Sequence, residues 1–236
     1  MSAYAGPEIV TNGLILALDS INSKSYPGSG TTWSDLSGKT NTCTLVDGPT
    51  YSAGAMTFDG TANRGHISSP SGRLSWSADT TFNQSLTFNV WVKSSDTTGY
   101  ILSKPWNGSG QYNYSIQPTS FNLLAGTTSN SITFTTVSTG SWVNLVCWVD
   151  GTNMGYYINS ATTGSKAHSC SGAIPSSGNA DVNLCVMSLY PYESGWAGST
   201  NFSMLGSLAV CQIYNRVLSA TEVAQNYAAL RGRFGV

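Results

Sequence analysis

The sequence predicts an all-β protein, a two-sheet antiparallel jelly-roll sandwich with one short C-terminal helix. Short runs of β-branched and aromatic residues recur along the 236 residues, separated by clusters of Gly, Asn, Asp and Ser. Such runs between turn-forming clusters are typical of strands in an all-β fold. Two of the longer runs alternate with a period of two residues, and helical periodicity is clear in one stretch near the C-terminus.

Thirteen runs are expected to form strands, and no linker, shift of composition or internal repeat divides them. We therefore expect residues 1–236 to form a single domain. The pair Asp150-Gly151 is a strong hairpin signal and should fold 142–149 back onto 154–158. The predicted strands are 14–18, 43–46, 55–58, 65–68, 86–92, 100–103, 112–116, 120–124, 131–135, 142–149, 154–158, 182–188 and 205–214.

Two of these strands, 86–92 and 142–149, have an aliphatic row on one face. Period-two patterning places such rows in the core between the sheets. Trp91 and Trp148 are then expected on the opposite face of their sheet. The core rows are Leu86, Phe88, Val90 and Val92 in the first strand, and Val143, Leu145, Cys147 and Val149 in the second.

One helix is predicted over about 220–230. Ser219-Ala220-Thr221-Glu222 forms a capping box, with Ser219 as N-cap and Glu222 bonding back to its backbone N–H. Arg231-Gly232 supplies a suitable end. An apolar stripe should hold the helix on the sandwich; its members are Val223, Tyr227 and Leu230.

Charged residues make up 9% of the chain, and the net charge is −1 at pH 7. The usual charged fraction is about a quarter. Ten Lys and Arg spread along the chain cannot form a large basic patch, so nucleic acid is not an expected partner. A weakly charged surface is less protected against association, which favours packing against other proteins.

No export signal or membrane segment is expected. The first ten residues, MSAYAGPEIV, lack a basic region followed by an apolar stretch. No apolar run approaches the roughly 18 residues of a membrane span. The number of cysteines is odd and no CxxC occurs, so we expect buried free thiols in a reducing cytoplasm. The cysteines are Cys43, Cys147, Cys170, Cys185 and Cys211.

Three stretches carry a resemblance to a known family: GLILALDSINSKSYPGSGTTWSDLSG at 13–38, AMTFDG at 55–60 and GSLAVCQIYNRVLSATEVAQNYAALRGRFGV at 206–236. Together they resemble the concanavalin-like (laminin G-like) domains of virion structural proteins from tailed phages, notably those of marine cyanobacteria. The resemblance covers essentially the whole chain, although the middle strands match only in pattern. IYNRxLS followed by a helix recurs in most of the superfamily, whereas SYPGSGTTW with NYxALRGRFG carries the phage inference.

Six residues form the structural signature of these stretches. We expect Tyr214 and Leu218 to anchor the helix, and Arg216 to bond loop carbonyls or a carboxylate. Trp33, the aromatic residue after the Pro27–Gly30 turn, should fill space in the core or at a sheet edge. The signature residues are Trp33, Tyr214, Arg216, Leu218, Ser219 and Glu222.

Catalysis is not expected. Some relatives with this sandwich are glucanases, which need two carboxylates flanking the scissile bond. No two of the eleven acidic residues lie within ten residues of one another. The two histidines, His66 and His168, belong to no HExxH motif, and no GxSxG occurs. Gly38-Lys39-Thr40 resembles the end of a phosphate loop, but Trp33 stands where the earlier glycine is required.

No metal and no cofactor are expected. Many relatives hold calcium with loop carboxylates, but the matching loop at 188–195 has only Glu193. Leu208-Ala209 stands where many relatives have an acidic residue. Asp59 with Asn63 is a weaker local candidate.

Aromatic residues that look exposed define a candidate contact surface. Protein partners use such residues as readily as sugars do. Protein contact, ordinary loop packing and glycan binding therefore stay open for these loops. The residues are Trp106 in KPWNG, and Tyr190, Tyr192 and Trp196 in a second segment.

These features together predict a non-enzymatic phage virion structural protein, capsid-decorating, that acts through surface contacts with other virion proteins of the capsid or tail. The expected location is the virion, after assembly in the host cytoplasm. The alternative is a receptor- or carbohydrate-binding module of a tail fibre or spike, with cell-surface glycans as its partner. Neither nucleic acid nor a membrane is an expected partner.

Overall fold

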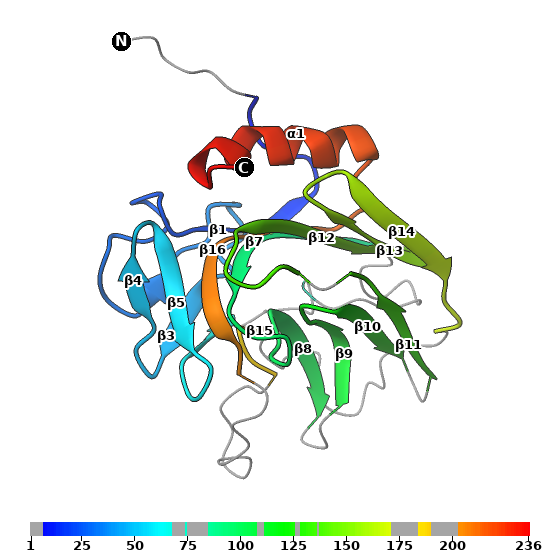
Figure 1. Ribbon diagram of the computed structural model, residues 1–236, viewed down its shortest axis with the longest axis horizontal. Helices are drawn as coiled ribbons and strands as arrows, with labels where there is room; N and C mark the ends of the chain where they lie inside the picture. The colour runs from blue at the N-terminus through cyan, green and yellow to red at the C-terminus, as the bar shows by residue number, and fades with distance from the viewer. Residues whose placement is uncertain are drawn as a thin grey trace.

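The computed structural model describes residues 7–67, 74, 85–107, 111–125, 128–135, 137–170, 184–189 and 203–236, with the backbone alone at 105–107, 111–112 and 125. Its strands form two antiparallel sheets, here called sheet A and sheet B. Helix α1 (Ala220–Leu230) lies on the outer side of sheet A (Figure 1). This arrangement confirms the predicted fold class.

Sheet A has eight strands, with the longest near its middle. These are β1 (Leu14–Asp19), β4 (Thr50–Ser52), β5 (Ala55–Asp59), β7 (Leu86–Ser94), β12 (Val143–Val149), β13 (Asn153–Ile158), β14 (Thr162–Ala167) and β16 (Leu205–Tyr214). Their order is β14-β13-β12-β7-β16-β5-β4, and β1 pairs with the second half of β16.

Sheet B also has eight strands, in the order β11-β10-β9-β8-β15-β6-β3-β2. These are β2 (Thr32–Trp33), β3 (Cys43–Val46), β6 (Arg64–Ile67), β8 (Leu102–Asn107), β9 (Gln111–Ile116), β10 (Ser120–Ala125), β11 (Thr128–Thr133) and β15 (Leu184–Val186).

The core between the sheets contains the two predicted aliphatic rows. All eight of their residues are buried in one hydrophobic cluster. Trp91 lies on the opposite face of sheet A, under α1, and Trp148 is half-buried on the same outer face. The predicted hairpin is confirmed, because β12 pairs with β13 across Asp150-Gly151. Period-two alternation therefore assigned both faces of these strands correctly.

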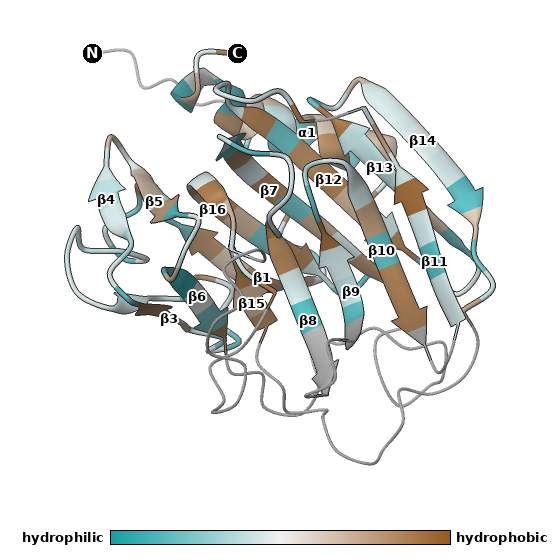
Figure 2. Cartoon of the chain, turned by 60° about the horizontal axis from the view of Figure 1, so that its bottom comes forward, coloured by the Kyte–Doolittle hydropathy of each residue, from teal (hydrophilic) through white to brown (hydrophobic). Residues whose placement is uncertain are grey.

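Several strand boundaries differ from the prediction, mainly at sheet edges. β14 was not predicted, and β11 covers 128–133 rather than 131–135. Both are edge strands with mostly exposed side chains, so their sequences show no apolar alternation. In Figure 2, β14 is pale along most of its length, whereas β10 and β12 are largely brown. β2 and β4, of two and three residues, were also missed.

Helix α1 begins at the predicted capping box. The Glu222 backbone N–H donates to Ser219 Oγ at 3.3 Å, and the Ser219 backbone N–H donates to Glu222 Oε2 at 2.9 Å. The helix ends at Leu230, as predicted, although Gly232 does not take a positive φ. The chain continues into a 3₁₀ turn (Arg231–Arg233), and the left-handed residue is Gly235, at φ +70°.

The signature residues occupy structural positions. Trp33 is fully buried in the main core. Tyr214 and Leu218 are buried in a smaller cluster beneath α1. Arg216 makes both expected kinds of contact: Nε donates to the Asn12 carbonyl at 3.0 Å, and its two terminal nitrogens donate to Glu222 at 2.9 and 2.6 Å.

A chain of buried polar side chains crosses sheet A under the helix. Asn144 Nδ2 donates to Asn89 Oδ1 at 2.6 Å, and Asn89 Nδ2 donates to Gln212 Oε1 at 2.7 Å. The Tyr214 hydroxyl is 3.3 Å from the same Gln212 oxygen and accepts from Asn226 Nδ2 at 3.0 Å. Because buried polar groups are expensive when unpaired, this chain fixes how the helix lies on the sheet.

Within the described ranges, no helix is long and apolar enough to cross a membrane. All five cysteines are free and buried, as predicted. Burial raises the pKa of the Cys43 and Cys147 thiols well above the usual range, and it raises the pKa of Cys185 and of Cys211 to about 12. These thiols are therefore protonated in mildly alkaline buffer.

The folded protein should resist alkylation at its cysteines, because all five thiols are buried away from the reagent and the reactive thiolate is not populated at Cys43, Cys147, Cys185 and Cys211. In guanidinium chloride all five thiols should react. Intact mass after a short pulse of iodoacetamide, with and without denaturant, measures both. Rapid modification of Cys43 or Cys211 in the folded protein, located by peptide mapping, would contradict their burial.

Candidate binding face

The predicted contact surface lies mostly outside the described residues. Tyr190, Tyr192 and Trp196 fall in the undescribed stretch 190–202. Trp106 has its backbone in β8, and its side chain is outside the described part.

The described residues nevertheless place the start of the second segment beside β8. Met187 takes a positive φ of 59° and turns the chain after β15. The Ser103 hydroxyl is then 2.7 Å from the Ser188 carbonyl oxygen and 3.0 Å from that of Leu189. Ser103 lies on the same strand as Trp106, so both predicted contact segments begin from one region of sheet B.

The outer face of sheet B carries a row of polar residues that sequence reasoning missed. The row contains one residue from each strand of sheet B, and each of these residues pairs with the next across the sheet. Their neighbours along each strand point the other way and contribute to the main core. We call these eight residues the polar row. They are Thr32, Thr44, His66, Cys185, Ser103, Ser115, Asn122 and Ser131.

The polar row is open at its two ends and covered at its centre. Thr44 and Ser131 are exposed, and His66 is half-buried. Ser103 and Ser115 are fully buried, and the chain at Ser188–Leu189 is bonded over Ser103. The open ends therefore offer hydroxyl groups and an imidazole on either side of a covered middle.

Asn122 illustrates how the row is organised on β10. Its Nδ2 is 3.2 Å from Ser115 Oγ, 3.1 Å from Ser120 Oγ and 3.3 Å from Gln117 Oε1. These bonds hold the amide against the sheet. The signal in the sequence was the alternation of Ser and Asn with large apolar residues in YNYSI and SFNLL, which marks a polar outer face.

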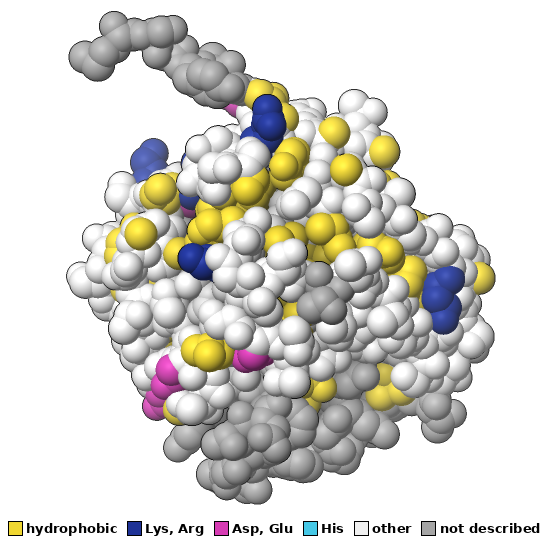
Figure 3. All heavy atoms as spheres, in the orientation of Figure 1, with side chains coloured by type: hydrophobic (Ala, Val, Ile, Leu, Met, Phe, Trp, Pro, Cys, Tyr) yellow, Lys and Arg dark blue, Asp and Glu magenta, His cyan; other side chains and the backbone are white. Residues whose placement is uncertain are grey.

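Few charged side chains lie beside the row, and at one end Lys166 Nζ donates to the Ser131 carbonyl at 2.9 Å. Beside its β3–β6 end, Arg64 pairs with Asp47 at 2.9 Å. Burial, followed by the charge of Arg64, lowers the pKa of His66 below its usual value. His66 is therefore neutral at pH 7, and the row carries no net charge. In the view of Figure 3, which looks at the edges of the two sheets, few Lys, Arg, Asp or Glu side chains appear among the described residues.

Asp59 and Asn63, the weaker calcium candidate, form hydrogen bonds within a turn. Asp59 Oδ1 accepts backbone N–H bonds from Thr61 at 2.8 Å and Ala62 at 3.2 Å, and Asn63 Oδ1 accepts from the Asp59 N–H at 2.6 Å. Across the described residues, no group of three His, Cys, Asp or Glu is placed to hold a metal ion.

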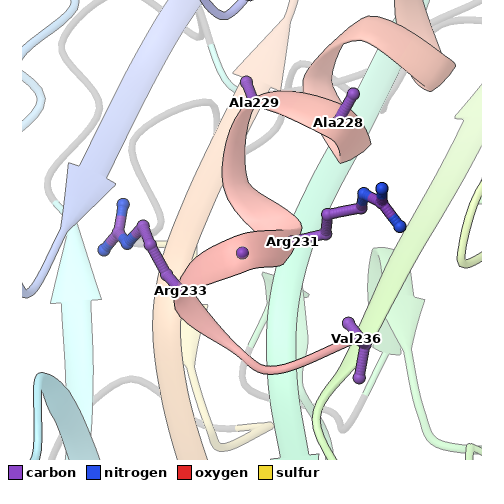
Figure 4. Close-up of a pocket in the computed structure, with 6 residues that line it drawn as sticks. Ala228, Ala229, Arg231, Arg233 and Val236 are labelled. Atoms are coloured by element: carbon purple, nitrogen blue, oxygen red, sulfur yellow. The ribbon is translucent and has the colours of Figure 1, made fainter. Parts of the chain in front are cut away.

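A surface hollow of about 460 Å³ lies at the C-terminal turn. Arg231 and Arg233 point away from each other there (Figure 4), and Arg233 is paired with Asp19 through two bonds of 2.8 and 2.7 Å. The two guanidinium groups therefore do not converge on one ligand. The lining residues are Ala228, Ala229, Arg231, Gly232, Arg233 and Val236.

Comparison with known families gives one match. Residues 59–224 match the family described as the concanavalin A-like lectin/glucanases superfamily. No curated protein matches the sequence.

Solved structures with similar folds belong to several kinds of protein. Domain 4 of AbnA, an extracellular arabinanase from Geobacillus stearothermophilus in complex with arabinotriose, is 16% identical, with a TM-score of 0.61 over 91% of this chain and 98% of that domain. Trypanosoma rangeli sialidase with 2,3-difluorosialic acid is 13% identical, with a TM-score of 0.62 over 97% of this chain and 35% of the sialidase. The binding domain of Paraclostridial Mosquitocidal Protein 1 is 13% identical, with a TM-score of 0.60 over 92% of this chain and 52% of that one.

These likenesses show a shared fold. The chain spans about a third of the sialidase and about half of the mosquitocidal binding domain, but nearly all of the arabinanase domain.

Proposed function

The chain belongs to the concanavalin A-like lectin/glucanases superfamily, and we propose from this that it is a binding protein without catalytic activity that holds an uncharged carbohydrate against the outer face of sheet B. The observation that carries this proposal is the polar row. Hydroxyl and amide groups in line across a sheet suit the hydroxyl groups of a sugar chain, which accept and donate in the same way.

Aromatic side chains would supply the apolar part of the contact. Trp106 lies on β8 three residues after Ser103, and the segment with Tyr190, Tyr192 and Trp196 starts beside that strand. Binding sites for small ligands typically combine aromatic surface with a few oriented polar groups. We propose that these four residues complete the site.

The proposed lack of catalysis rests on the carboxylates. A glycosidase needs two carboxyl groups about 5 to 10 Å apart, and the polar row contains none. Seven described acids are already engaged in ion pairs or turns, which ties them to structure. They are Asp19, Asp35, Asp47, Asp59, Asp96, Asp150 and Glu222.

The second candidate function is capsid decoration on a phage virion. SYPGSGTTW and NYxALRGRFG support it by resemblance, and the 9% charge content suits contact with other proteins. Under this proposal the same aromatic segments meet virion proteins of the capsid or tail, and the protein is located in the virion.

A glycan array probed with the intact protein tests the first proposal. We expect saturable binding to neutral glycans that depends weakly on salt, because few charges are available to be screened. Thr44→Arg and Ser131→Arg should each weaken binding by about tenfold or more, equivalent to about 1.4 kcal/mol, by blocking the open ends of the row.

Ser52→Arg is the matched control, since Ser52 is exposed on the edge strand β4 of the other sheet. Its binding should equal that of the unsubstituted protein. An array without saturable hits, together with stable attachment to phage particles that lack the protein, would reject the carbohydrate proposal in favour of decoration.

A further inference from the structure

Trp148 differs from the other tryptophans described on the outer face of sheet A. Trp91 is fully buried and stacked 4.2 Å from Phe234, and Trp142 packs 4.8 Å from the same ring. Trp148 is half-buried, and it has neither a ring partner nor a hydrogen bond within the described part of the chain. It is not among the residues of the two hydrophobic clusters beneath α1.

The indole of Trp148 lies against a glycine on the next strand. Trp148 pairs with Gly155 across β12 and β13. A Cβ atom added to Gly155 would be 2.6 Å from Cε2 and 2.6 Å from Cζ2 of the indole. The six-membered ring therefore lies against the glycine, and the half-buried indole keeps part of its surface open to solvent.

Hydroxyl groups border this ring on the strand beyond the glycine. Gly155 pairs with Ser165, and Tyr157 pairs with Thr163, across β13 and β14. Ser165 and Thr163 are exposed and share the outer face with Trp148. The ring and the two hydroxyls thus form one shelf at the β14 edge of sheet A.

The opposite border of the shelf is the turn at residues 216–218, in which the charged side chain of Arg216 is ion-paired. Thr87 is the β7 neighbour of Trp148, and its hydroxyl donates to the Arg216 carbonyl at 2.7 Å and accepts from the Leu218 N–H at 3.0 Å. The Arg216 guanidinium is held by Glu222. An uncharged ligand therefore suits the shelf better than an ionic one.

We propose that the shelf formed by Trp148, Thr163 and Ser165 is a second carbohydrate site, which takes a neutral β-1,4-linked pyranose of glucose configuration. With its substituents equatorial, such a ring has a flat face of C–H groups that can lie on the indole. Its hydroxyls then reach Ser165 and Thr163. The site lies on the outer face of sheet A, so it does not depend on the polar row of sheet B.

The test uses the intact protein labelled with 5-fluorotryptophan and titrated with cellotetraose. Fluorine NMR resolves the tryptophans, and Trp148→Phe identifies the Trp148 resonance. We expect that resonance to shift saturably, with a dissociation constant of about 1 mM. The Trp91 resonance should stay in place because that ring is buried. The Ser165→Ala, Thr163→Ala double variant should weaken the titration severalfold.

Two results would overturn the proposal. One is a Trp148 resonance that does not move with cellotetraose. The other is a shift that follows protein concentration in the absence of sugar, which would assign the shelf to contact with a second copy of the chain. The Thr44→Arg variant separates the two sites, because it should leave the Trp148 titration unchanged even where array binding is lost.

Discussion

Replacing Trp91 with Ala should lower the free energy of unfolding by about 3 to 5 kcal/mol, the range for removing a large buried aromatic side chain. Trp91 is fully buried, and its ring stacks 4.2 Å from Phe234 and 5.6 Å from Tyr227. Tyr227 belongs to α1 and Phe234 follows the 3₁₀ turn, so one side chain joins sheet A to the whole C-terminal segment.

Chemical denaturation measures this change, with Trp148→Ala as the matched control. Both are tryptophans on the outer face of sheet A, but Trp148 is half-buried and unstacked. The control should lose less than Trp91→Ala does, in proportion to the smaller apolar area that it buries. Equal losses in the two variants would mean that the C-terminal segment does not pack on Trp91.

The position of Trp91 could be predicted, but its environment could not. Alternation in 86–92 places it opposite Phe88 and Val90, which is where the structure has it. Alternation cannot say whether the second face of a strand meets solvent or another element. Asn89 and Asn144 follow the same pattern, and they are buried in the polar chain beneath α1.

The edge strand β14 shows the opposite difficulty. TTGSKA has no apolar row because both its faces are largely exposed. Its pairing comes from the β13 hairpin and from close contacts that need glycine. Gly155 makes room for Trp148, and a Cβ on Gly164 would be 2.7 Å from the Tyr156 ring. Such contacts join residues on different strands, so they become visible only when the strands are paired.

The candidate site was predicted from aromatic residues, whereas the structure adds a polar surface. Trp106 stood out because large aromatic residues in Gly-rich segments are easily recognised. Ser103, Ser115 and Asn122 did not, because Ser and Asn are common throughout this chain. Only the register of three strands brings them into one line. Their shared place in the sheet, rather than their residue type, makes them a surface.

Lowering the pH should destabilise the folded protein, because it protonates the Glu222 carboxyl. Two bonds from Arg216, and then the Ser219 N–H, lower the pKa of this carboxyl from 4.5 to about 2. A carboxyl whose pKa is lower in the folded state contributes stability above its unfolded pKa and loses it as the pH falls. The loss should therefore run from about pH 5 down to about pH 2.

The expected loss over that range is about 1 to 2 kcal/mol, since both side chains of the ion pair remain 28% exposed and solvent screens them. Denaturant melts at a series of pH values give the size and the midpoint. Glu222→Gln should be less stable than the unsubstituted protein at neutral pH, and its stability should vary less between about pH 5 and about pH 2, because it has no charge to lose.

Glu8→Gln, at an exposed carboxyl, is the control and should keep the full dependence of stability on pH. If Glu222→Gln retained the same acid dependence as the unsubstituted protein, other carboxyl groups would have to carry it, and the Arg216–Glu222 pair would not fix the start of α1.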